Sequence, residues 1–190
     1  MQKYKNTRHL QEFEAMAKNL AGYTHTCVIS FIDLYQKVLR NFPEVRTVGS
    51  QERIQIGKAF AEIGRKYNMI IKACAEGDEL APYGVDCKGC MTLETFEAAL
   101  HRTLQAPRWK PSREECACFL GNDIGAYHTC GHLCKYCYAN YDEAKVKHNM
   151  GMHDPESPFL LGDLRPEDQV HEAKQESWVD GQLRLDFDVL

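Results

Sequence analysis

Apolar positions at helical spacing alternate along the chain with short, nearly continuous apolar runs. Hydrophobic side chains recur every three or four positions over residues 7–21 and 50–67, which predicts two amphipathic helices. Apolar runs at 24–32 and 69–74 predict two strands that are buried on both faces. A short helix is expected over 34–41, between the first strand and the second long helix.

The order of strand, helices and strand predicts a parallel crossover unit. We therefore expect an α/β fold, either part of a (β/α) barrel or an open parallel sheet. Ligands bind such sheets at the edge where the carboxyl ends of the strands meet. That edge would carry Asp33 after the first strand, and Cys74 and Glu76 after the second. The two carboxylates could hydrogen-bond a hydroxyl-bearing ligand, or they could cap the segments that follow them.

The sequence pattern predicts three regions. Residues 1–111 form the barrel-like α/β domain, which closes with a loop and a helix capped by Thr92. Residues 112–162 are an irregular, cysteine-rich segment. Residues 163–190 are a polar tail that ends in a hairpin around Asp180-Gly181, because this turn-forming pair lies between short apolar stretches.

Nine cysteines are many for a chain of 190 residues. The polar start has no apolar signal-peptide core, and no stretch has the apolar length of a membrane span. We therefore expect a cytoplasmic protein with reduced thiols, in which metal binding or catalysis outranks a disulfide framework. The net charge of −4 predicts no broad attraction to nucleic acid or anionic lipid, although a local basic patch stays open.

The most specific pattern is Cys-x-x-x-Cys-x-x-Cys, formed by Cys130, Cys134 and Cys137. Three soft thiolates in one short loop suit iron–sulfur or zinc chemistry. The spacing is that of the cluster loop in radical S-adenosylmethionine (SAM) enzymes, where a [4Fe–4S] cluster with three protein thiolates keeps one iron open for a cofactor. Tyr136 could shield such a metal from water or simply pack in the core.

A structural zinc ion is the alternative at this loop, and it would need a fourth ligand. The residues that could supply this ligand are His128, His132 and Cys118.

A second set of cysteines could hold an auxiliary cluster or a zinc ion. Its members are Cys74, Cys90, Cys116 and Cys118. Cys87 forms a Cys-x-x-Cys pair with Cys90, of which only one member need be used. The alternative is that these cysteines are unpaired thiols under a loop, since sequence cannot show that distant segments converge.

The cysteine block resembles a known family. Residues 116–118, 123–127 and 129–140, with support from 30–35 and 153–158, resemble a bacterial domain-of-unknown-function family, number 1848. That family has a C-terminal cysteine cluster similar to that of radical SAM proteins. The resemblance extends roughly to Gly162, and this chain is similar to the family's carboxyl-terminal two-thirds. It implies a metal cluster but no named reaction.

Together, the spacing and the resemblance predict a radical-SAM-like iron–sulfur protein that cleaves SAM and acts on an unknown substrate, with an electron donor as its partner. The alternative is a non-catalytic module in which zinc or a closed cluster fastens a loop-rich segment to the domain. A third hypothesis, repair or modification of nucleic acid, is disfavoured by the negative net charge.

Overall fold

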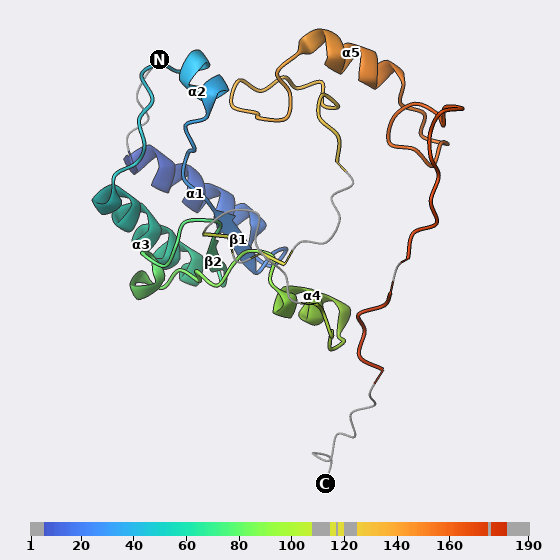
Figure 1. The fold of residues 1–190 in the computed structure, drawn as a ribbon. Helices are drawn as coiled ribbons and strands as arrows, with labels where there is room; N and C mark the ends of the chain where they lie inside the picture. The colour runs from blue at the N-terminus through green and yellow to red at the C-terminus, as the bar shows by residue number, and fades with distance from the viewer. Residues whose placement is uncertain (1–5, 108–114, 117, 120–124, 175, 182–190) are drawn as a thin grey trace. The chain divides into compact units, whose positions relative to one another are not determined.

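The computed structural model describes residues 6–107, 115–116, 118–119, 125–174 and 176–181 (Figure 1). The elements in chain order are α1 (Asn6–Leu20), β1 (Thr26–Ile29), α2 (Gln36–Asn41), α3 (Ser50–Lys66), β2 (Ile70–Ala73), the 3-10 helix η1 (Ala81–Tyr83), α4 (Leu93–Leu100) and α5 (Glu143–Gly151).

The chain divides into two compact units, and each is described by itself. The first unit contains Met1–Phe31, Gly49–Leu120 and Gln175–Leu190, and the second contains Ile32–Val48 and Gly121–Lys174. The boundaries predicted from composition stay a prediction. No helix in the described part of the chain has the length and apolar character that crossing a membrane requires.

The first unit is built on a parallel pair of strands. β1 and β2 pair in register from Thr26 opposite Ile70 to Ile29 opposite Ala73. The predicted α/β class and crossover are therefore confirmed, and the described residues form an open two-stranded sheet rather than a closed barrel. Both strands are shorter than the apolar runs that predicted them.

The core of the first unit lies on one face of this sheet. Its buried side chains come from α1, α3, β2 and the loop after β2: Phe13, Ala61, Ile71, Ala73, Leu80 and Val85. The prediction that both faces are buried is wrong, because Val28 is 49% and Ile70 57% exposed. The two residues alternate with the core-facing positions, so they lie on the face opposite the buried cluster.

The capped helix is confirmed in shorter form. The Thr95 amide donates to Thr92 Oγ1 at 3.4 Å, and α4 ends at Leu100 because His101 adopts a left-handed conformation with φ of 52°. After α4, residues 103–105 pair in antiparallel fashion with the tail, since the Gln105 amide donates to Trp178 O at 2.7 Å. Residues 182–190, which include the second strand of the predicted hairpin, lie outside the described residues.

The second unit contains α2, the cysteine loop and α5. Among its described residues, the buried side chains are Val38, His128, Asn140 and Val146. The α5 helix begins at Asp142, whose carboxylate accepts the Lys145 amide at 3.1 Å, and the Asn149 side chain donates to His128 O at 3.1 Å. This helix is therefore tied to the segment that precedes the cysteine loop.

Substitution of Gly64 by alanine tests the close approach of α3 to β2. A Cβ at Gly64 would lie 2.7 Å from Met69 O and 2.9 Å from Ile71 Cδ1, so the strand must shift to make room. We expect Gly64→Ala to lower the free energy of unfolding by about 1–3 kcal/mol in urea denaturation. Gly49→Ala, before the same helix, is the control because no atom lies within 4 Å of its Cβ position. Equal stability of the two variants would contradict this packing.

Candidate metal centre

Three thiols from distant parts of the sequence meet beyond the carboxyl end of β2. Cys74 directly follows the strand, Cys90 lies in the loop after η1, and Cys118 lies in the segment after α4. Their sulfur atoms all lie within 4.8 Å of one another. Cys90 Sγ is 3.4 Å from Cys74 Sγ and 2.9 Å from Cys118 Sγ. Among the described residues, this is the group of metal-type ligands that the fold brings together.

Cys116 is the fourth member of the set. It is 6% exposed and Cys118 is 7% exposed. Both members of the pair are buried. The structure therefore brings together three cysteines of the second predicted set, Cys74, Cys90 and Cys118, and the role of Cys116 as a fourth ligand stays a prediction.

Backbone hydrogen bonds hold the three segments in place. The Cys74 amide donates to Ile29 O at 3.0 Å, which fixes this cysteine to the end of the sheet. The Phe119 amide donates to Met91 O, which joins the residue after Cys118 to the residue after Cys90. The convergence of the sulfurs is therefore imposed by the main chain.

The thiols perturb one another's acidity. Burial, followed by hydrogen bonds to Cys118 and Cys74, raises the pKa of Cys90 to about 12. Burial opposes ionisation of Cys118, but hydrogen bonds from Cys90, from backbone amides and from Cys116 outweigh it, so the pKa of Cys118 is lowered. Cys118 therefore ionises more readily than an ordinary thiol, and an anionic sulfur is what a metal binds.

The spacing of these sulfurs fits a single ion. A regular tetrahedron with metal–sulfur bonds of about 2.3 Å separates its sulfurs by about 3.8 Å. In a cubane cluster each thiolate binds a different iron, so the sulfurs stand farther apart. The three sulfurs of Cys74, Cys90 and Cys118 lie within the smaller range, and a tetrahedral shell would need one further ligand. This cysteine cluster could therefore hold a metal ion.

Cys87 and Cys27 are directed elsewhere. Cys87 Sγ donates to Val85 O at 3.7 Å, and both side chains pack against the core of the first unit. Burial raises the pKa of each thiol. Of the Cys-x-x-Cys pair, the structure therefore brings Cys90 to the sulfur set and leaves Cys87 in the core.

The loop with Cys130, Cys134 and Cys137 belongs to the second unit. Its thiols are unoxidised; Cys130 and Cys134 are exposed and Cys137 is half-buried. The Cys137 amide donates to Cys134 O at 3.0 Å, which forms a tight turn, and Leu133 has a left-handed φ of 50°. The three sulfurs are not part of the close group, and their role as ligands of a larger cluster stays a prediction.

Two of the three predicted cofactor contacts lie beside this loop. The Asp33 amide donates to the hydroxyl oxygen of Tyr136 at 3.3 Å. The Tyr136 ring packs against Tyr35, with centroids 5.5 Å apart, and Tyr35 also packs edge-on against Tyr138. The structure therefore places Asp33 beside the cysteine loop, where its amide bonds to Tyr136. The sequence did not predict this contact, because the two residues are far apart in the chain.

Glu76 lies in the first unit and its carboxylate is already engaged. Oε1 accepts the Phe31 amide at 2.6 Å, and Oε2 lies 3.3 Å from Nη2 of Arg53. Arg53 also pairs with Glu79 and lies over the Phe31 ring. Glu76 thus ties the segment after β1 to α3, so a structural role explains its position.

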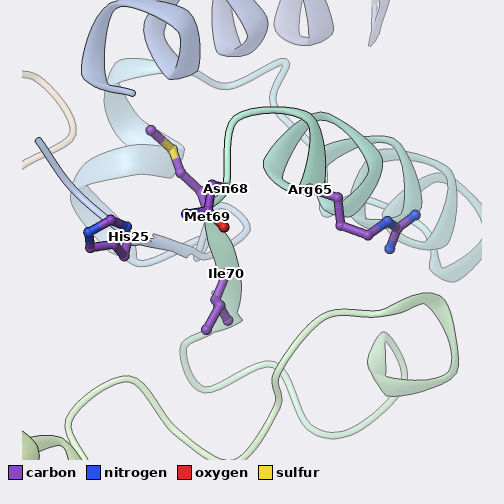
Figure 2. Close-up of a pocket in the computed structure, with 5 residues that line it drawn as sticks. All are labelled: His25, Arg65, Asn68, Met69 and Ile70. Atoms are coloured by element: carbon purple, nitrogen blue, oxygen red, sulfur yellow. The ribbon is translucent and has the colours of Figure 1, made fainter. Parts of the chain in front are cut away.

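Figure 2 shows a separate hollow at the amino end of β2, of about 400 Å³, lined by His25, Arg65, Asn68, Met69 and Ile70. The Arg65 side chain extends away from His25 in this view. The lining residues do not converge on one point, so the cysteine set is the better candidate for a functional site.

The fold and the site define an α/β protein with a cysteine cluster suited to a metal. A family model described as a domain of unknown function (DUF1848) matches residues 1–139, and the chain belongs to this family. The match ends after Cys137 and therefore includes all nine cysteines. No curated protein and no solved structure matches the chain.

Replacement of Cys90 tests the cysteine set. We expect Cys90→Ala to abolish tetrahedral Co²⁺–thiolate absorption from the first unit, because this sulfur contacts two of the other three. Cys87→Ala is the matched control, since it lies three residues away and its thiol points to a carbonyl. Loss of the signal in both variants, or in neither, would contradict the assignment.

Replacement of Glu76 separates its structural role from ligand binding. Glu76→Gln keeps an acceptor for the Phe31 amide but removes the buried carboxylate that pairs with Arg53, which leaves Glu79 as the other carboxylate beside this guanidinium. We therefore expect the free energy of unfolding of the metal-free protein to fall by about 1–3 kcal/mol in urea denaturation. Glu12→Gln removes an exposed pairing to Arg8 and should change stability by less than about 1 kcal/mol. Unchanged stability of Glu76→Gln would favour the ligand role instead.

Proposed function

We propose that this chain is a thiolate metalloprotein with two centres of different kinds. In the first unit, Cys74, Cys90, Cys116 and Cys118 hold one ion in a closed tetrahedral shell. In the second unit, Cys130, Cys134 and Cys137 hold a radical-SAM-like [4Fe–4S] cluster with one open iron. The observation that carries the proposal is the meeting of Cys74, Cys90 and Cys118 within 4.8 Å, since soft thiolates are the ligands that select zinc and iron–sulfur centres.

The first centre is structural in this proposal. Its four thiolates leave no open position for a substrate, which distinguishes closed sites from catalytic ones. It would fasten the loop after η1 and the segment after α4 to the end of β2, where the described chain has little regular structure. Zinc suits such a shell, and a single iron is the other candidate.

The second centre is the catalytic one. Three thiolates within eight residues leave one iron for the amino and carboxylate groups of SAM. A cluster held by Cys130, Cys134 and Cys137 would supply the one-electron reduction that cleaves SAM and thereby permits removal of a hydrogen atom from a substrate. The chain's part is to orient SAM and to exclude water. Asp33 and Tyr136 lie beside the loop and are the residues that we assign to contacts with SAM.

A non-catalytic module is the second candidate. The closed set of four thiols favours it, because a metal there would act through stability alone. In that case the exposed loop would bind a closed cluster or zinc, with a fourth ligand from elsewhere.

Anaerobic reconstitution separates these functions. We expect the wild-type chain to bind iron and sulfide, and to yield 5′-deoxyadenosine when SAM and dithionite are added. Cys134→Ala should lose about four iron atoms per chain and all SAM cleavage, because a cluster loop with two thiolates does not hold its cubane. Cys87→Ala should keep both, since its thiol is packed in the core.

The outcome decides between the candidates. A colourless protein that contains only zinc would exclude the radical-SAM-like enzyme. A brown protein that can be reduced but never yields 5′-deoxyadenosine would exclude SAM cleavage and support the non-catalytic module. Full iron and sulfide in Cys134→Ala would show that the loop is not the site of the cluster.

A further inference from the structure

One lysine binds the cysteine loop from a segment about a hundred residues earlier in the sequence. Lys37 is the second residue of α2 and lies in the second unit together with the loop. Its ammonium donates to Cys134 O at 3.1 Å, to Cys137 O at 2.9 Å and to Asn140 O. An ammonium has three N–H donors, so these contacts use its full capacity.

The neighbouring side chains complete this arrangement. Asn41, one helical turn after Lys37, donates to Lys135 O at 2.8 Å. The buried Asn140 side chain donates to Cys130 O at 2.9 Å. Each of the three cysteines in the loop therefore has its carbonyl oxygen bound by a side-chain donor, and two of the three bind the same ammonium. This arrangement fixes the loop before any metal is present.

The acceptors of Lys37 are neutral carbonyls, which leaves its positive charge available to the loop. Only a few covalent bonds separate each cysteine carbonyl from the sulfur of the same residue. The ammonium is therefore nearer to the thiolates than the screening length of about 8 Å at physiological salt. Net charge and hydrogen bonding around a cluster are among the determinants of its reduction potential.

We propose that Lys37 is a positioning residue for the metal cluster at this loop. Its ammonium preorganises the loop and stabilises the reduced state of the cluster electrostatically. This inference rests on the proposed function, because it requires a cluster at Cys130, Cys134 and Cys137. Reduction adds one electron to an already anionic assembly, so a fixed cation beside it favours the reduced form. Loss of the charge then makes the cluster harder to reduce.

The test compares the midpoint potential of the loop cluster in full-length, anaerobically reconstituted variants. The signal of this cluster is defined as the part of the electron paramagnetic resonance spectrum that Cys134→Ala lacks. Lys37→Gln removes the charge and keeps an amide donor, whereas Lys37→Arg keeps the charge. Arg40→Gln is the matched control, because it removes an exposed positive charge from the same short helix.

We expect Lys37→Gln to lower the ratio of reduced to oxidised cluster at a fixed potential by about tenfold, which is a shift of about 59 mV for a one-electron couple. The midpoint potential of Lys37→Arg should stay nearer to that of the wild type, and the midpoint potential of Arg40→Gln should equal that of the wild type. A Lys37→Gln cluster with wild-type loading and potential would overturn the proposal, as would an equal shift in Arg40→Gln.

Loading supplies a second measurement. Lys37→Gln could keep the circular dichroism of the wild type but bind no cluster. In that case, a Lys37→Arg variant that still binds the cluster supports the proposal. If Lys37→Arg and Arg40→Gln also fail to bind the cluster, the proposal is overturned. Equal iron content in wild type and Cys134→Ala would instead refute the proposed function, so the two failures are distinguishable.

Discussion

The constraint on which the first unit depends is the meeting of the thiols of Cys74, Cys90 and Cys118 beyond the end of β2. Cys74 follows β2 at the edge of the core, and Cys90 and Cys118 meet it there from later parts of the chain. A sheet of two strands with one covered face supplies little apolar burial to order such segments. Binding of one ion to four thiolates would contribute that order, since metal-binding energy adds directly to the stability of the fold.

The second unit solves the same ordering problem with hydrogen bonds. The cysteine loop has few buried apolar side chains, and its carbonyls are bound by Lys37, Asn41 and Asn140. The donors to these carbonyls come from side chains, because the loop has neither helix nor strand. In the proposed function, the first centre would form where its ligands converge, and the second would form on a loop whose backbone is held by side-chain donors.

Periodicity alone predicted the long helices, both strands and their parallel pairing, because amphipathic spacing and apolar runs are local signals. It missed α5, where Val146 is the one buried side chain among nine residues, and it placed Val28 and Ile70 inside. The cysteines were visible as candidates, but their meeting depends on contacts between distant segments. Lys37 could not be found at all, since one lysine in a short polar helix carries no pattern.

X-ray absorption at the metal edge of the purified Cys134→Ala chain tests the central claim most directly, because the loop of this variant keeps only two thiolates while the sulfur set of the first unit is unchanged. We predict one ion per chain surrounded by four sulfurs at about 2.3 Å. A shell of nitrogen and oxygen atoms, or a protein that binds no metal while its thiols stay reduced, would contradict the assignment of Cys74, Cys90, Cys116 and Cys118 as ligands.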